Sequence, residues 1–188
     1  DCGPTDYTYC YLNNDNMQRL YQGDGLPVGI RFRSGSTYGA DAARVYDGVD
    51  DLTTPTDLSG DLANELVTST NVDFALLLTA ASDGVLSCED GYATEWDYVV
   101  ACYDGCTQPT ASFAVGPDCD NEQFSITVNL TAVGSTGTVS ITNDGGAPAV
   151  TATAIGTYTV GPFDSQDEVN VEVVGASLLC SWTSPKLT

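Results

Sequence analysis

Histidine is absent from this chain of 188 residues, and basic residues are few. Without histidine the chain has neither a Ser-His-Asp triad nor a Cys-His pair, and zinc sites built on histidine are excluded too. Lysine and arginine together number 5 against 26 acidic residues, which gives a formal net charge of −21. Nucleic-acid binding relies on Lys and Arg that neutralise phosphates, so nucleic acid is excluded as a partner and anionic lipid surfaces are disfavoured.

Long apolar runs are missing as well. No stretch of about 18 apolar residues occurs, so we expect no membrane insertion. The seven cysteines do not form the paired C-x-x-C spacing of a zinc ribbon. Oxidised cysteines are then expected, and they place the protein outside the cytoplasm, at the cell surface or secreted. The first residue is Asp1 rather than Met and the chain ends after Ser184-Pro185 and three more residues, which we interpret as a mature or excised piece of a longer protein.

What the sequence does contain is alternation with a period of two. Along residues 124–130 the apolar side chains Phe124, Ile126, Val128 and Leu130 alternate with polar ones, which predicts a half-buried strand. Further strands are predicted around Val139 to Ile141, Tyr158 to Val160 and Val169 to Val173. Between them, Asn143-Asp144-Gly145-Gly146 and Gly161-Pro162-Phe163-Asp164 are typical of tight turns. Short strands at this spacing predict a β-sandwich.

The first half has the same character. Val28, Ile30 and Phe32 alternate, a continuous apolar run from Phe74 to Ala81 suits a central strand, and residues 96–100 supply another. Only 14–21 and 61–66 have room for a turn or two of helix. The predicted fold class is therefore all-β, with two tandem antiparallel sandwiches, because the length suits two domains of roughly 80 to 110 residues.

A domain boundary is predicted near Asp104-Gly105, so that the modules are residues 1–104 and 105–188. The charge divides unevenly between them. The first module has 18 acidic residues and four arginines, a net charge of −14, whereas the second has eight acidic residues and one lysine, a net charge of −7. The first module is the better candidate for binding cations.

The first module resembles the CUB domain, a family of extracellular β-sandwiches of the jelly-roll type. The segment 41–48, Asp-Ala-Ala-Arg-Val-Tyr-Asp-Gly, matches a strand and turn of that family, and Ser82-Asp83-Gly84 matches the turn after its long apolar strand. Other matching residues are Cys88, Gly91, Trp96 and Cys102 near the end, and Tyr9-Cys10-Tyr11 with Asn13-Asn14 near the start. The resemblance covers roughly residues 1–104.

The second module resembles the immunoglobulin-like or fibronectin type III-like repeats of large surface proteins of gliding bacteria. Cys119, the strand 124–130, the segment 156–163 and Cys180 carry the similarity. The resemblance implies export by type IX secretion.

The resemblance and the spacing together predict disulfides between Cys88 and Cys102 and between Cys119 and Cys180. A bond between Cys2 and Cys10 would tie down the N-terminus. Cys106 is then left over, and bonds to Cys102, to Cys2 or to a neighbouring chain remain open for it. Our hypothesis is that Cys106 is free or intermolecular.

Many CUB domains hold calcium, and the resemblance implies Asp41 and Asp83 as two of its ligands here. Calcium takes six to eight oxygen ligands, so further carbonyls, hydroxyls or water would be needed. A third acid is expected before Asp41, where Arg33-Ser34-Gly35 stands instead, and an arginine there would oppose a cation. The alternative is that Asp41 and Asp83 cap turns. Asp47, Asp50 and Asp51 form a second acidic cluster that is either a cation site or a solvated turn.

The inventory of catalytic groups is thin, and we expect no enzymatic activity. Ten tyrosines and two tryptophans suit recognition, with Tyr7, Tyr9 and Tyr11 on one face of an extended segment, unless these rings cover the core instead. The leading hypothesis is a non-catalytic binding or structural module of a cell-surface adhesin, stalk or filament protein. Its partner would be a glycan, a protein or neighbouring copies of the same protein. The alternative is an accessory carbohydrate- or protein-binding region of a secreted hydrolase.

Overall fold

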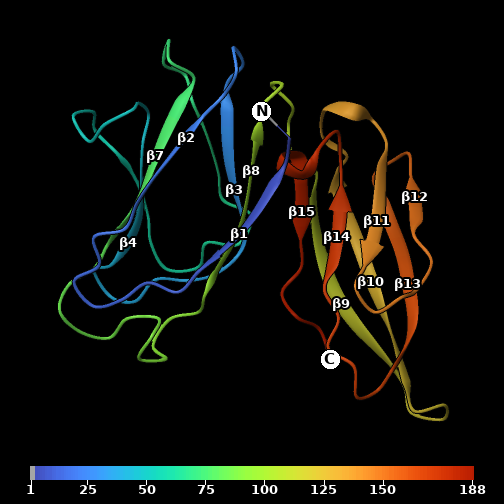
Figure 1. Ribbon diagram of the computed structural model, residues 1–188. Coiled ribbons are helices and arrows are strands. Elements are labelled where there is room, and N and C mark those ends of the chain that lie inside the picture. The colour runs from blue at the N-terminus through green and yellow to red at the C-terminus, as the bar shows by residue number, and fades with distance from the viewer. Residues whose placement is uncertain (1–2) are drawn as a thin grey trace. The chain divides into compact units, whose positions relative to one another are not determined.

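Strands and two short 3-10 helices, η1 (Gly134–Thr136) and η2 (Leu178–Cys180), make up the regular structure of residues 3–188, the part of the chain that this computed structural model describes (Figure 1). The predicted fold class is confirmed: the described residues form four antiparallel sheets and two tandem β-sandwiches, with no α-helix. The chain divides into two compact units, residues 1–104 and 105–188. Among the described residues there is no helix with the length and apolar character needed to cross a membrane.

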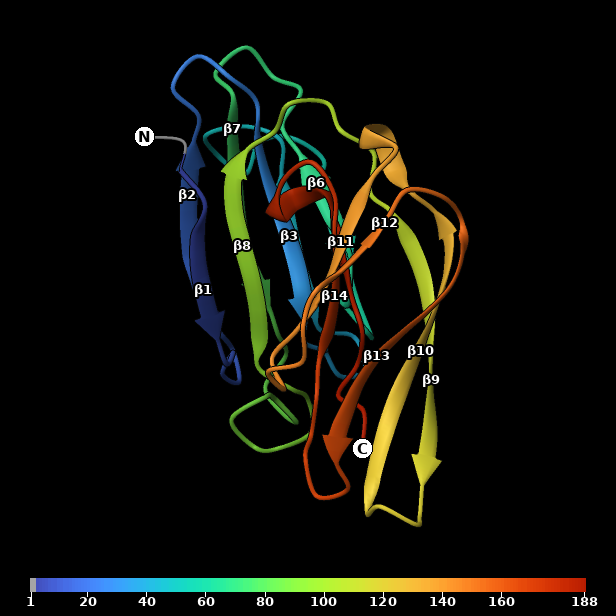
Figure 2. The ribbon, with the colours of Figure 1, turned by 90° about the vertical axis from the view of Figure 1, so that its right-hand side faces the viewer.

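The first unit contains strands β1 to β8. One sheet has the order β1 (Thr5–Tyr9), β8 (Trp96–Cys102), β3 (Val28–Ser34) and β6 (Leu66–Thr68), which Figure 2 shows side by side. The other has the order β2 (Gln18–Gln22), β7 (Ala75–Ala81), β4 (Ala42–Tyr46) and β5 (Thr56–Leu58). Every pairing within them is antiparallel.

The sequence pattern explains these strands. In β3 the alternating residues Val28, Ile30 and Phe32 are buried in the core, as predicted. In β7 six consecutive residues are buried, and this strand is interior to its sheet, with β2 on one side and β4 on the other. The apolar run that begins at Phe74 is therefore confirmed as a central strand.

Aromatic rings fill the core of the first unit. Trp96 is fully buried, with its ring centroid 5.4 Å from that of Tyr11 and 6.1 Å from that of Phe32. Tyr7 stacks on Tyr98 at 5.4 Å. Of the two interpretations of Tyr7, Tyr9 and Tyr11, the one in which these rings cover the core is therefore confirmed.

Neither of the two segments with room for helical turns forms one. Residues 18–22 form β2, which pairs with β7 residue by residue from Gln18 opposite Thr79 to Gln22 opposite Ala75. Residues 61–66 form a turn that enters β6. Both segments are too short for a helix to be stable alone, and in the sandwich each contributes a buried side chain, Tyr21 and Leu62 respectively.

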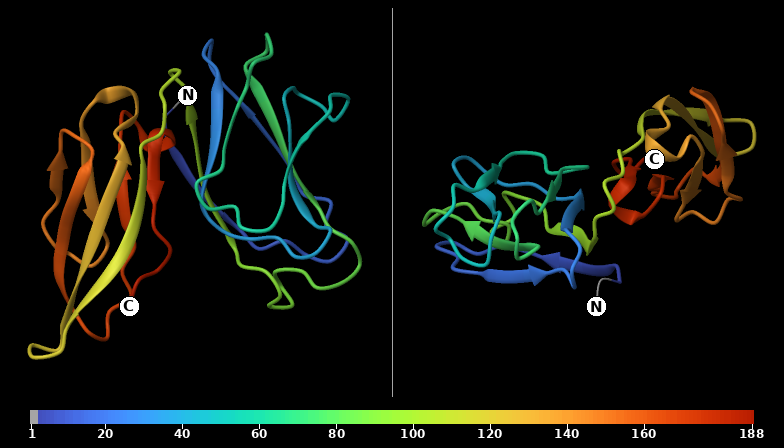
Figure 3. Two further views of the ribbon diagram at one scale, coloured as in Figure 1. Left: turned by 180° about the vertical axis from the view of Figure 1, so that it is seen from behind. Right: turned by 90° about the horizontal axis from the view of Figure 1, so that it is seen from above.

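The second unit pairs a three-stranded sheet with a four-stranded one. The first has the order β13 (Gly156–Asp164), β10 (Gln123–Ala132) and β9 (Thr110–Asp118), and Figure 3 shows it from behind. The second has the order β12 (Val150–Ala152), β11 (Val139–Asn143), β14 (Val171–Val174) and β15 (Ser181–Thr183). The predicted alternation in β10 is confirmed, since its four apolar residues from Phe124 to Leu130 are at most 4% exposed.

The two glycine-rich segments of this unit behave differently. Residues 143–146 form the predicted turn, in which a side chain on Gly145 would meet the Phe163 ring at 2.7 Å. Residues 161–164 are not a turn. They lie within β13, where the register shifts opposite Phe124 and Ile126, and Gly161 takes the positive φ of 126° at this bulge.

The disulfides differ from the predicted pairs. Cys10 bonds Cys88, with Cα atoms 5.3 Å apart, and Cys106 bonds Cys180, with Cα atoms 6.1 Å apart. Among the described residues Cys119 is free and exposed. The predicted bonds Cys88–Cys102, Cys2–Cys10 and Cys119–Cys180 are therefore wrong, and so is the hypothesis that Cys106 is free or intermolecular.

The positions of the cysteines in the fold explain the difference. Cys10 follows β1 and Cys88 lies between β7 and β8, and these connections meet at one end of the first sandwich. Cys106 precedes the nine-residue strand β9 and Cys119 follows it, so the two lie about 30 Å apart. Only one of them can reach Cys180. Cys102 is disulfide-bonded, and Cys2 lies outside the described residues.

Candidate functional site

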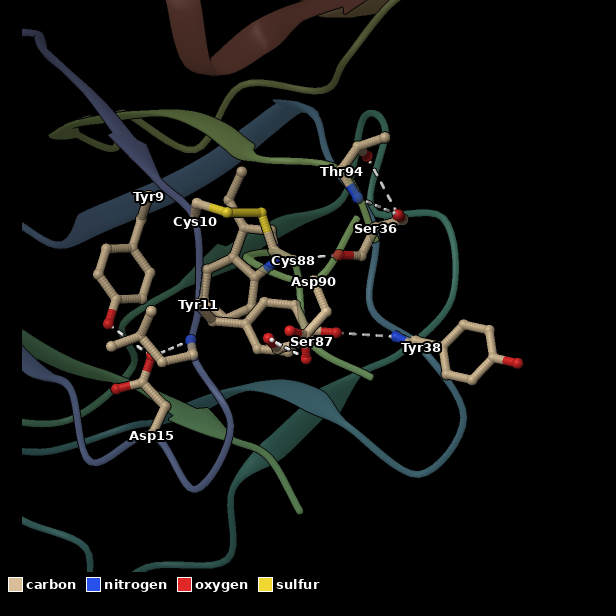
Figure 4. The surroundings of a disulfide bond; sticks show 12 residues. Tyr9, Cys10, Tyr11, Asp15, Ser36, Tyr38, Ser87, Cys88, Asp90 and Thr94 are labelled. Atoms are coloured by element: carbon tan, nitrogen blue, oxygen red, sulfur yellow. Dashed lines mark hydrogen bonds between the residues drawn. A yellow bond between two sulfur atoms is a disulfide. The ribbon is translucent and has the colours of Figure 1, made fainter. Parts of the chain in front are cut away.

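Three connections of the first unit meet at one end of its sandwich. They are residues 10–17 between β1 and β2, residues 35–41 between β3 and β4, and residues 82–95 between β7 and β8, and we call them together the loop end. The register places them together, because Tyr9 pairs with Trp96 and Ala42 pairs with Ala81. The Cys10–Cys88 disulfide links the first connection to the third, as Figure 4 shows.

The buried acid of the loop end is Asp41, which is only 2% exposed. Its Oδ1 atom accepts the backbone N–H of Asp83 at 2.9 Å, and its own N–H donates to the carbonyl of Tyr38 at 3.0 Å. Its Oδ2 atom is buried with no hydrogen-bond partner among the described residues. A buried carboxylate oxygen without a partner is costly, so it calls for a cation or a donor.

Asp83 lies beside Asp41 and is less constrained. Its Oδ1 atom accepts the N–H of Val85 at 3.0 Å, and its carbonyl accepts the N–H of Asn14 at 2.7 Å. Each of the two predicted acids therefore caps a backbone N–H with one carboxylate oxygen and keeps the other. Turn capping therefore accounts for only one of the two carboxylate oxygens of each acid.

Tyr11 lies between these groups. It is 1% exposed, and its hydroxyl oxygen accepts the N–H of Tyr38 at 3.0 Å. Burial is the main reason that the pKa of Tyr11 is raised to about 12. The hydrogen bond from Tyr38 opposes this, whereas a hydrogen bond to the Asp41 side chain and the negative charges of Asp41 and Asp83 add to it. Both carboxylates thus lie within electrostatic range of one hydroxyl group, which places them in a single site.

The arginine that was expected to oppose a cation does not do so. Arg33, on β3, bonds two acids of the neighbouring strands in its own sheet. Its Nε atom donates to Asp97 on β8 at 3.1 Å, and its Nη1 atom lies 2.8 Å from Asp6 on β1. Burial lowers the pKa of Arg33, but the bonds to Asp97 and Asp6 outweigh it and raise the pKa overall. The positive charge of Arg33 is compensated there.

Two further acids of the loop end are occupied by hydrogen bonds. The carboxylate of Asp15 accepts the Tyr9 hydroxyl at 2.6 Å and the N–H groups of Leu12 and Met17, each at 2.9 Å. Asp90 accepts the Asn13 side chain at 2.7 Å. These two acids hold the loops in place, and Glu89 and Glu95, the remaining acids of the loop end, are exposed.

In the second acidic cluster, the carboxylate of Asp47 is engaged in hydrogen bonds with Thr70 and Asn71. Asp47 accepts the N–H of Thr70 at 2.9 Å, the Thr70 hydroxyl and the side chain of Asn71. Burial raises the pKa of Asp47, yet these hydrogen bonds lower it overall. Asp47 therefore holds a turn together, and only Asp50 and Asp51 of this cluster remain exposed.

Two exposed tyrosines complete the loop end, and sequence reasoning missed them. Tyr38 is 43% exposed and Tyr92 is 54% exposed, and their rings meet edge to face with centroids 5.5 Å apart. Figure 4 shows the Tyr38 ring projecting away from Tyr11 and the disulfide. The available signal was their position: both lie in connections, outside the period-two pattern that buries the other aromatic residues.

Neither a protein-family model nor a curated protein sequence matches the chain. Among solved structures, it is similar to the glycoside hydrolase domain of Endo-D from Streptococcus pneumoniae R6, with 11% identity and a TM-score of 0.30. The match covers 97% of this chain and 32% of that one, so the chain spans about a third of that structure's length. At this TM-score the likeness carries no argument about fold or function.

Proposed function

We propose that this chain is a non-catalytic extracellular binding module of a cell-surface adhesin or stalk protein, with a CUB-like first unit and an immunoglobulin- or fibronectin type III-like second unit. The observation that carries the proposal is the loop end of the first unit. There the buried carboxylate of Asp41 keeps an unpartnered oxygen beside Asp83, next to two exposed tyrosines.

Calcium fits the donor set of this loop end. The free oxygens of Asp41 and Asp83 are hard anionic ligands of the kind that calcium prefers, and backbone carbonyls and water supply the rest. The ion would compensate the buried charge of Asp41. In addition, Asp41 and Asp83 come from two different connections, so a shared ion would fix these loops relative to each other.

The binding surface in this proposal is the tyrosine pair. Tyr38 precedes Asp41 by three residues and is tied to it through its carbonyl, and the backbone N–H of Tyr92 donates to Ser87 at 3.2 Å. Both rings are thus exposed on loops whose backbones are already fixed. Exposed rings held in place present amphipathic surface at a small entropic cost, which suits a glycan or a protein ligand.

Export is part of the same proposal. The disulfides Cys10–Cys88 and Cys106–Cys180 belong to an oxidising compartment, and a net charge of −21 keeps such a surface strongly solvated. The chain contains no histidine, and the described loop end offers carboxylates and tyrosine rings for binding. A role in binding, without chemistry, accounts for these groups.

The test is binding of the full chain to arrays of immobilised glycans and of purified extracellular matrix proteins, in millimolar calcium and in EDTA. We expect binding in calcium, loss in EDTA, and loss when Tyr38→Ser and Tyr92→Ser are combined. Val72→Ser removes a side chain that is 90% exposed outside the loop end and serves as the matched control. Failure to bind any array member, or binding that survives the double tyrosine variant, contradicts the proposal.

A further inference from the structure

A groove of about 500 Å³ lies on the outer face of the β2-β7-β4-β5 sheet. The residues that line it are Gln18, Leu20, Val49, Asp50, Asp51 and Leu77. None of them belongs to the loop end, so the groove is a separate feature of the first unit. Its volume falls within the range of about 300 to 1,000 Å³ that is typical of ligand sites.

The apolar part of the groove follows from strand periodicity. In β2 the neighbours of Leu20 face inward: Arg19 donates to the Tyr98 hydroxyl at 2.9 Å, and Tyr21 is 9% exposed. Leu20 must therefore face outward, where it is 50% exposed and lies opposite Leu77 in the ladder. Val49, 45% exposed, adds a second open aliphatic side chain.

The acidic part comes from Asp50 and Asp51, in the connection after β4. Both residues are exposed, and the Oδ1 atom of Asp50 accepts the N–H of Leu52 at 3.2 Å. Each described basic residue has a partner other than Asp50 and Asp51: Arg19 bonds Tyr98, Arg31 bonds Asn64, Arg33 bonds Asp97, and Lys186 bonds Glu168. Arg44, which faces outward on the same sheet, pairs with Asp57. The two carboxylates at the groove are thus uncompensated within the described residues.

We propose that this groove receives a lysine side chain of a partner protein. Lysine combines an aliphatic stem, which would lie on Leu20, Val49 and Leu77, with an ammonium group that would sit by Asp50 and Asp51. The compact ammonium has three donors and suits two separate carboxylates, whereas arginine favours one carboxylate held by both its nitrogens.

Charge complementarity identifies the partner as a different, basic protein. The first unit has a net charge of −14, so a basic surface is attracted to it and directed toward the uncompensated acids. A second copy of this chain does not meet the requirement, because its one lysine, Lys186, already pairs with Glu168 at 2.9 Å.

The test is a methyl NMR titration of the full chain, in EDTA, with N-acetyl-lysine methylamide as the probe. We expect saturable shifts at the methyl groups of Leu20, Val49 and Leu77. The norleucine analogue keeps the stem and lacks the ammonium, so it should bind at least about tenfold more weakly, a difference of about 1.4 kcal/mol.

Two double variants separate site binding from general attraction. Asp50→Asn with Asp51→Asn should abolish saturation, while the asparagine at position 50 can still accept the N–H of Leu52. Asp24→Asn with Glu65→Gln removes the same charge from exposed positions outside the groove and should leave binding unchanged.

Three outcomes overturn the proposal. Equal weakening by both double variants would show attraction to the acidic surface as a whole. Equal binding of the norleucine analogue would make the groove merely apolar, and tighter binding of the arginine analogue would rule out lysine as the preferred residue. Since the titration is done in EDTA, its result does not depend on calcium at the loop end, and either proposal can fail alone.

Discussion

Removing the Cys10–Cys88 disulfide should destabilise the first unit and leave the second unchanged. The bond closes a loop with a sequence separation of 78 residues. The chain-entropy relation for a loop of that length gives about 4.5 kcal/mol of stabilisation. With a urea dependence of about 1.5 kcal/mol per molar, the midpoint of the first unit should fall by about 3 M.

Tryptophan fluorescence follows each unit separately. Trp96 is fully buried in the first unit and Trp182 packs against the core of the second, so Trp182→Phe and Trp96→Phe backgrounds each isolate one transition. The perturbation is Cys10→Ser combined with Cys88→Ser. The matched control is Cys106→Ser with Cys180→Ser, whose separation of 74 residues predicts nearly the same loss in the second unit. A loss below about 1 kcal/mol in the first unit, or an equal shift of the Trp182 transition, refutes this reasoning.

Three further predictions concern single groups. Because hydrogen bonds lower the pKa of Asp47, its contribution to stability is present above about pH 4 and is lost as the pH falls through the lower pKa of the folded state. The urea midpoint, measured as a function of pH, should therefore fall in this acid range for the native chain and not for Asp47→Asn. Burial is the main reason that the pKa values of Tyr9, Tyr11 and Tyr21 are raised, so absorbance titration of the ten tyrosines should leave these three protonated at about pH 11. For the same reason the first unit should lose stability as the pH rises above about 10. Titration of all ten tyrosines together in the folded state would contradict this prediction. Non-reducing peptide mapping after alkylation without denaturant should find Cys119 modified and Cys10 joined to Cys88, and a bond between Cys119 and Cys180 would contradict the structure.

Periodicity predicted the strands because burial on one face is a local property of the sequence. The alternation from Phe124 to Leu130 and the apolar run into β7 both became strands with the expected burial. The turn at residues 143–146 followed from its glycines in the same way. The segment 161–164 has similar composition but lies inside β13, because a bulge needs the same positive φ that a turn does.

Disulfide partners depend on which connections meet in space, and this is not a local property. Cys88 is closer in sequence to Cys102 than to Cys10, yet the sandwich brings the connection after β1 to the one after β7. For the same reason the direction of Arg33 could not be read from its position in the sequence. The two predicted acids Asp41 and Asp83 do lie together, but the neighbouring tyrosine pair became visible only once the loops were placed.

The most direct test of the calcium-organised loop end is thermal unfolding of the native chain and of Asp41→Asn, each in EDTA and in millimolar calcium. The asparagine can still accept the N–H of Asp83, and it removes the negative charge of a buried carboxylate whose Oδ2 atom has no hydrogen-bond partner among the described residues. We therefore predict that the variant is at least as stable as the native chain in EDTA, whereas calcium stabilises the native chain and not the variant. Asp24→Asn, an exposed acid outside the site, should respond to calcium as the native chain does. No calcium-dependent shift in the native chain, or an equal shift in Asp41→Asn, would contradict the account.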